Sequence, residues 1–154
     1  MSDIKHTNIF PINEKAAYHI YSGVMKIHKK FLEVKPNRNT ICLLILDINC
    51  LNETHQSNLC NSMTEIIRQE FMREFDFITL EMVKNLYTDL WRFHKKYFSP
   101  VKDNEYWGDI ISDAKVIGAK YNCRFCNLML LAIEDELDIN WTEKYGSSRP
   151  KAGA

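Results

Sequence analysis

Two stretches, YSGVMKIHKKF (Tyr21–Phe31) and YTDLWRFHKKY (Tyr87–Tyr97), lie 66 residues apart and share a pattern. Each begins with tyrosine, and each has a basic residue two positions before His-Lys-Lys and an aromatic residue. Similarity at a fixed spacing indicates a repeated structural unit. The pair therefore predicts a duplicated fold.

The same offset, applied without gaps, aligns identical residues well beyond these two stretches. Ile45 falls on Ile111, and Asp47 falls on Asp113. The stretch CNSMTEIIRQEF then falls on CNLMLLAIEDEL, with Cys, Asn, Met, Ile and Glu in common. We interpret the chain as two copies of one unit, so that each copy helps to interpret the other.

The opening segment of each copy has a helical pattern. In the second copy, apolar residues recur at steps of three and four from Met82 to Phe98, and Ser99-Pro100 follows. This spacing predicts an amphipathic helix, which proline terminates. The counterpart in the first copy extends from about Ile12 to Glu33, before Pro36.

The middle segment is ambiguous until the copies are aligned. Trp107 to Tyr121 has helical periodicity, with acidic residues before it that suit the positive end of a helix. By itself, TICLLILDINC (Thr40–Cys50) could be a buried strand, but the alignment predicts a helix. The third helices are expected from near Ser62, where Ser-x-x-Glu is a capping-box pattern, and over Arg124 to Asp138.

The predicted fold is therefore all-α, with six helices in two tandem three-helix units. We expect the first unit at residues 1–76, the second at 77–140, and a mobile tail at 141–154. Three short helices bury little apolar surface by themselves. The units are thus expected to share one core as a single compact domain, arranged about a pseudo-twofold axis.

Bulk composition restricts the class of protein. The 154 residues are 45% hydrophobic and 26% charged, and 20 basic residues balance 20 acidic ones, so no overall charge attracts nucleic acid or anionic membrane. The polar start MSDIKHTNIF predicts no secretory signal, and the longest apolar run, ICLLIL, is too short to span a bilayer. Five cysteines without disulfide-type spacing favour reduced thiols in a cytoplasm.

Cys123 and Cys126 have the only metal or redox spacing in the sequence. A single CxxC pair is weak evidence for zinc, and the repeat matches Cys126 with Cys60 but Cys123 with Ser57. We predict small buried thiols and no metal. A site that adds His55 to these three cysteines is the alternative.

The repeated His-Lys-Lys motifs are the clearest candidate for a repeated functional feature. The histidines lie on the apolar stripes, whereas the lysines point away. Such lysines can simply stabilise a helix C-terminus, or they can bind phosphates or an acidic protein surface. Large aromatic residues of the second copy can fill the core or anchor a partner. The candidate partner-binding residues are Lys26, Lys29, Lys30, Arg92, Lys95, Lys96, Tyr106 and Trp107.

The acidic residues offer little for catalysis. Asp47 and Asp113 form a matched pair without further ligands at suitable spacing, so helix-pairing roles are favoured. The run from Glu134 to Asp138 reads as a solvated face or as a mimic of nucleic acid. No glycine-rich phosphate loop, dinucleotide fingerprint or nucleophile–base pattern is present, so we expect no cofactor and no enzymatic activity.

The second half resembles small proteins encoded by bacteriophages and prophages of Gram-positive bacteria. The residues that carry the resemblance are Phe93–Tyr97, Pro100, Asp103–Trp107, Tyr121, Phe125–Cys126 and Leu130–Leu137. The resemblance implies a viral accessory protein in a host bacterial cytoplasm, a class whose small members often bind and disable a host protein. It implies no catalytic residues.

Two function classes follow from these features. The first is a protein that binds a host protein, for example as an inhibitor of a defence system such as CRISPR. The second is a nucleic-acid-binding regulator that uses the basic helix ends. A metal-dependent enzyme has the least support, and the sequence leaves the oligomeric state open.

Overall fold

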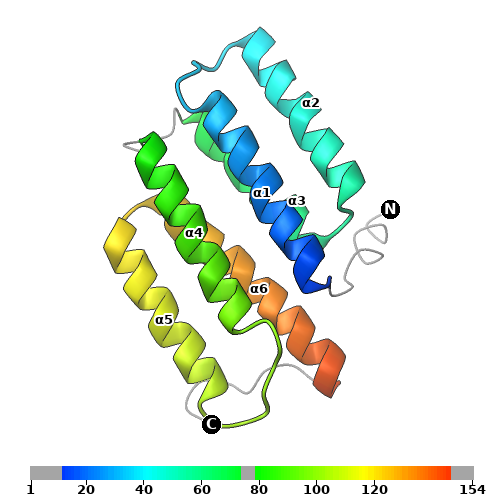
Figure 1. Ribbon diagram of the computed structural model, residues 1–154. Coiled ribbons are helices and arrows are strands. Elements are labelled where there is room, and N and C mark those ends of the chain that lie inside the picture. Colours follow the sequence, from blue (N-terminus) through cyan, green and yellow to red (C-terminus); the bar gives the residue numbers. More distant parts are fainter. Residues whose placement is uncertain (1–11, 74–78, 147–154) are drawn as a thin grey trace.

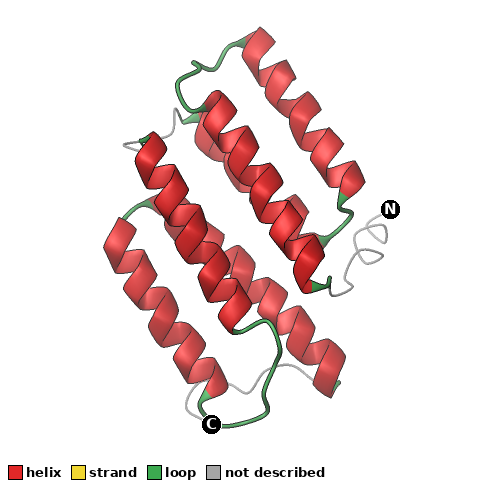
Figure 2. Cartoon of the chain, in the orientation of Figure 1, coloured by secondary structure: helices red, strands yellow, loops and turns green. Residues whose placement is uncertain are grey.

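The computed structural model describes residues 12–73 and 79–146, and these residues form an all-helical bundle (Figure 2). The helices are α1 (Glu14–Phe31), α2 (Arg38–Thr54), α3 (Asn58–Met72), α4 (Leu80–Lys96), α5 (Tyr106–Tyr121) and α6 (Arg124–Tyr145). No strand occurs within the described ranges. The predicted fold class is therefore confirmed, and the segment that could have been a strand is helix α2.

Four helices form the centre of the bundle, and two flank it (Figure 1). Helix α1 packs on α4, and α3 packs on α6, so each central helix contacts its counterpart in the other half of the sequence. Helix α2 covers α1 and α3 on one side, and α5 covers α4 and α6 on the other. In Figure 1, α1 and α4 run antiparallel at the centre of the view.

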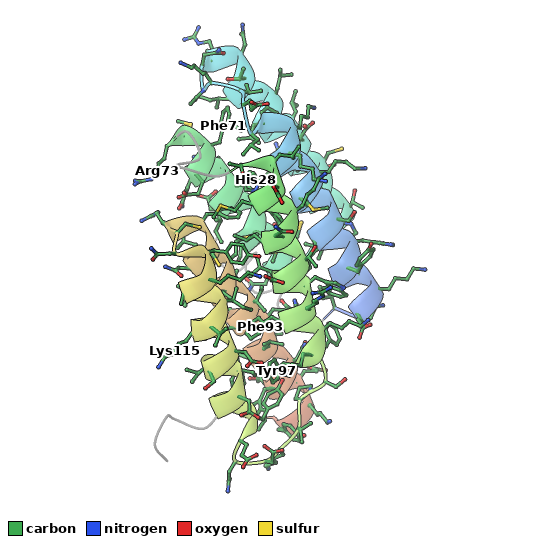
Figure 3. The ribbon with its side chains drawn as sticks, turned by 60° about the vertical axis from the view of Figure 1, so that its left-hand side comes forward. His28, Phe71, Arg73, Phe93, Tyr97 and Lys115 are labelled. Atoms are coloured by element: carbon green, nitrogen blue, oxygen red, sulfur yellow. The ribbon has the colours of Figure 1, made fainter. Side chains whose placement is uncertain are left out.

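One continuous apolar core connects both halves. Its largest fully buried side chains come from all six helices and include Ile20, Leu44, Phe71, Leu90, Ile110 and Phe125. In Figure 3, His28 and Phe71 lie inside the bundle, whereas Lys115 points away from it. The predicted boundary between the units, at residues 76 and 77, lies outside the described residues.

Polar side chains fix the start of the helices. The residue before α1, α2, α3, α4 and α6 accepts a hydrogen bond from a backbone N–H in the first turn, which satisfies a donor that has no partner within the helix. These capping residues are Asn13, Asn37, Ser57, Thr79 and Cys123. At α5, Asp103 performs this role, because its Oδ1 accepts from the N–H groups of Glu105 and Tyr106.

Two helix limits differ from the sequence prediction. Helix α3 begins at Asn58 and not near Ser62, because Ser57 is the side chain that caps it and Leu59 is already buried. Helix α6 continues to Tyr145, because Trp141 is buried against the ring of Tyr106. Residues 141–145 are thus helical, and residues 147–154 of the predicted tail lie outside the described residues.

Candidate functional site

The α1–α4 contact contains two buried tyrosine–histidine hydrogen bonds. Tyr21 Oη lies 2.8 Å from His94 Nδ1, and Tyr87 Oη lies 3.0 Å from His28 Nδ1. Since Tyr87 and His94 follow Tyr21 and His28 by 66 residues, the two bonds are reciprocal. They join the two halves at the centre of the bundle.

Burial determines the chemistry of these groups. Both histidines are 0% exposed, and loss of hydration lowers the pKa of each to about 3. Burial also raises the pKa of both tyrosines well above the ordinary value. At neutral pH all four side chains are therefore uncharged, and the histidines act as packing and hydrogen-bonding groups.

A groove of about 200 Å³ lies between α1 and α4, with Tyr21 and Tyr87 in its lining. The other lining residues are Tyr18, Ser22, Met25, Thr88, Trp91 and Arg92. Tyr18 is 52% exposed, and its ring meets the Trp91 ring edge-on at a centroid distance of 5.5 Å. The groove thus presents an accessible aromatic pair above a floor of tyrosines.

The aromatic pair belongs to one end of a face that is otherwise nearly matched between the halves. Ser22 and Met25 correspond to Thr88 and Trp91 at the offset of 66, but Tyr18 corresponds to Lys84. The two halves therefore place tyrosine and tryptophan together only once. This asymmetry distinguishes one end of the groove from the other.

The basic residues of the repeated motif divide into two groups. Lys30 Nζ lies 2.7 Å from Asp47 Oδ2, and Lys96 Nζ lies 2.9 Å from Asp113 Oδ2, so these two lysines join neighbouring helices. The remaining four form no ion pair within residues 12–73 and 79–146; they are Lys26, Lys29, Arg92 and Lys95. The lysine–aspartate contacts are the helix-pairing role expected for the matched aspartates.

The two aromatic candidates of the second copy are in the core. Tyr106 is 6% exposed and Trp107 is 7% exposed, and both rings pack against Trp141. Tyr106 Oη also donates to the backbone oxygen of Tyr97 at 2.6 Å. These side chains therefore stabilise the α4–α5 connection and are not available as surface anchors in the folded chain.

The CxxC pair acts as a helix cap. The backbone N–H of Cys126 donates to Cys123 Sγ over 3.4 Å at the start of α6. Cys126 is 0% exposed, and burial raises the pKa of its thiol to about 12, so the thiol is not ionised at neutral pH. Among the described residues, no group of three or more His, Cys, Asp or Glu side chains gathers where it could hold a metal ion.

A reciprocal clamp between α4 and α5 was missed by the sequence reasoning. Asp113 Oδ2 accepts from Lys96 and from Tyr97 Oη at 2.5 Å. In the opposite direction, Asp89 Oδ2 accepts from Lys120 at 2.7 Å and from Tyr121 at 2.5 Å. The signal was a Lys-Tyr dipeptide at the end of two successive helices.

The acidic segment of α6 is not a uniformly solvated face, as the sequence suggested. Glu136 is 0% exposed, and burial raises the pKa of its carboxyl group to about 7, although the Ile12 backbone partly offsets this. Neither oxygen has a well-aligned hydrogen bond in the described part of the chain. Its counterpart Glu70 is also buried but accepts from Arg124 Nε at 3.1 Å.

The chain was compared with known proteins. A scan against protein-family models matches none of them, and searches of curated proteins and of solved structures find no match. Over the described ranges, none of the helices combines the length and apolar character needed to cross a membrane.

Proposed function

We propose that the protein acts by binding another protein through the groove between α1 and α4. The observation that carries the proposal is the accessible pair of Tyr18 and Trp91 beside Arg92. Tyrosine, tryptophan and arginine are the residues that most often dominate the binding energy of protein interfaces. The groove offers all three within one small surface.

The groove also indicates the chemistry of the partner. Met25 and the two aromatic rings can receive an apolar side chain, while Arg92 and the exposed Lys26 surround it with positive charge. An acidic partner surface with a projecting apolar residue would fit this arrangement. Charge complementarity of this kind mainly accelerates association and improves specificity.

The resemblance to phage and prophage proteins suggests the source of the partner. A viral accessory protein of this kind would bind a host protein and act as an inhibitor, for example of a CRISPR system. Binding, and not catalysis, is the proposed activity, because the buried histidines are neutral and inaccessible.

Affinity capture with matched variants tests the proposal. The tagged protein is incubated with a nuclease-treated lysate of a Gram-positive bacterium, in parallel with Trp91→Ala, Tyr18→Ala and the control Leu131→Ala. Leu131 is 57% exposed but lines a different groove, between α5 and α6. We expect one stoichiometric protein to be retained by the wild type and the control, and to be lost with the two groove variants.

The size of the loss can then be measured with the purified partner. Removal of a central aromatic anchor costs about 2 kcal/mol, or roughly 30-fold in affinity, through faster dissociation. Circular dichroism checks that each variant is folded. Retention of full affinity by both groove variants would exclude this groove as the binding site.

Nucleic-acid binding is the second candidate. The four basic side chains without an ion pair in the described ranges, next to an aromatic pair, are also suited to phosphates and stacked bases. Affinity for generic single-stranded DNA or RNA that falls steeply with salt, and falls further in Arg92→Ala, would favour this function. Capture of the same protein before and after nuclease treatment would favour the first.

A further inference from the structure

The outer face of α2 is the largest row of exposed apolar side chains along one described helix. Leu43 is 52% exposed, Leu46 is 63% exposed, and Cys50 is also exposed, at helical steps of three and four residues. Ile45, 38% exposed, and the exposed Cys42 border this row. Only Leu44 and Ile48 of α2 are buried, so most of the apolar surface of this helix faces outward.

The matching helix of the second half does not share this face. At the offset of 66, Asp109 and Ser112 of α5 take the places of Leu43 and Leu46. Both helices occupy flanking positions in the bundle, as Figure 1 shows. The apolar surface is therefore a property of α2 alone and is not required by the fold.

The charges at the two ends of α2 indicate what covers the face. Arg38 lies in the first turn, at the positive end of the helix, and Glu53 lies in the last turn, at the negative end. Each charge is thus at the unfavourable end of its own helix dipole. Both residues are exposed, and neither forms an ion pair within the described ranges.

An antiparallel second α2 reverses this disadvantage. In such a pair, Arg38 lies at the C-terminal end of the partner helix, close to its Glu53, and Glu53 lies at the N-terminal end. Leu46 is the midpoint of Arg38–Thr54 and the most exposed of the three leucine and isoleucine side chains on this face, so it meets its own copy at the centre. The face is therefore self-complementary in both apolar character and charge.

We propose that two copies of this chain associate through an antiparallel pairing of their α2 helices, centred on Leu46. This is independent of the groove between α1 and α4, which stays accessible in the dimer. A single pair of helices buries a small area, so the association is weak and concentration-dependent. The dimer would present two copies of the α1–α4 groove to partners.

Sedimentation equilibrium with a matched control tests which face is used. We expect the wild type to form dimers as its concentration rises, and Leu46→Asp to raise the dissociation constant about tenfold or more. The control is Val116→Asp, since Val116 is 69% exposed on α5 and corresponds to Cys50. This control should dimerise like the wild type. A monomeric wild type, or equal loss in both variants, would overturn the proposal.

Charge exchange tests the antiparallel register without altering the apolar face. Arg38→Glu and Glu53→Arg should each weaken self-association, because like charges then face each other. A mixture of the two variants should form a heterodimer, because one chain then carries glutamate at both positions and the other carries arginine at both, so opposite charges meet at each end of the pair. If the mixture associates no better than the separate variants, the antiparallel pairing is wrong.

The exposed cysteines supply an independent readout of the same register. In the proposed pair, Cys42 lies at the same level along the seam as Cys50 of the second copy. A short bis-maleimide should therefore link two chains of the wild type, but not of Cys42→Ser or Cys50→Ser. Persistence of the link in either single variant would indicate a different pairing and would contradict the proposal.

Discussion

At the scale of single residues, the centre of the bundle holds several polar groups that burial has made neutral. His28 and His94 each exchange a hydrogen bond with a tyrosine of the other half. Glu136 has no comparable side-chain partner in the described part of the chain, and its negative charge contributes to raising the pKa of Tyr21, after burial. The carboxyl group of Glu136 is therefore the buried group whose protonation changes near neutral pH.

The raised pKa of Glu136 predicts a pH-dependent difference in stability between the wild type and Glu136→Gln. Its pKa is about 7 in the folded state and near 4.5 when unfolded. Between these values the folded state binds more protons, so this group stabilises the fold at low pH and the contribution is lost as the pH rises from 4.5 through 7. Glutamine has no such loss.

Urea denaturation at pH 4.5 and pH 8 measures this difference. Relative to the wild type, Glu136→Gln should gain up to about 3 kcal/mol of stability between the two conditions. The histidine contributions, whose lowered pKa values destabilise the fold as the pH falls below 6.5, are common to both proteins and cancel. A difference that does not vary with pH would show that the carboxyl group titrates normally.

At the scale of helices, capping residues decide where each element begins. Ser57 Oγ accepts the N–H of Cys60 at 3.1 Å, whereas Ser62 lies inside α3. Removing a serine cap costs about 1 kcal/mol, so Ser57→Ala should lower the unfolding free energy by that amount. Ser62→Ala, the matched control, should change it little. Equal effects would support the start near Ser62 that the sequence suggested.

The close packing of α1 on α2 depends on Gly23. A Cβ atom at this position would lie 2.5 Å from Leu51 Cδ1, so α2 or the leucine must move. At the equivalent position in the second half, Asp89 holds a salt bridge to α5, and a groove of about 310 Å³ lies between α4 and α5. Gly23 therefore permits a closer helix contact than its counterpart does.

Alanine substitution at two glycines measures this constraint. Both Gly23→Ala and Gly108→Ala gain helix propensity, but a Cβ at Gly108 meets no atom within 4 Å. We expect Gly23→Ala to be less stable than Gly108→Ala by about 1–3 kcal/mol, because overpacking opposes the gain. Thermal denaturation of the two variants gives the comparison, and equal stabilisation would mean that Leu51 moves aside without cost.

The sequence predicted the helices better than the environment of individual side chains. Periodicity and the repeat identified all six helices, including α2, because both depend on local spacing. The burial of Glu136 was missed, because an acidic residue among others on a helix resembles a solvated one until the neighbouring helices are placed. Trp107 and Tyr106 were ambiguous for the same reason, since core and interface use the same aromatic residues.

At the scale of the whole molecule, the two halves are connected at their centres and not only at a boundary. The starts of α1 and α3 precede those of α4 and α6 by 66 residues, and the reciprocal hydrogen bonds follow the same offset. These correspondences support the duplicated, pseudo-twofold architecture that the repeat predicts. Since α1 packs on α4 and α3 packs on α6, neither half keeps its apolar surface buried without the other.

This shared core predicts that the two halves unfold together. All three tryptophans lie in the second half, so their fluorescence reports directly on that half alone. Phe71 lies in the first half, is 0% exposed, and packs against the Phe31 ring at 5.5 Å. Phe71→Ala should lower the unfolding free energy by about 3–5 kcal/mol, and the tryptophan signal should report this full loss in a single transition. Met72→Ala, a neighbouring change at a side chain that is 48% exposed, should alter it by less than about 0.5 kcal/mol. If the tryptophan transition of Phe71→Ala instead coincides with that of the wild type, the halves are independent domains and the reciprocal contacts between α1 and α4 do not couple them.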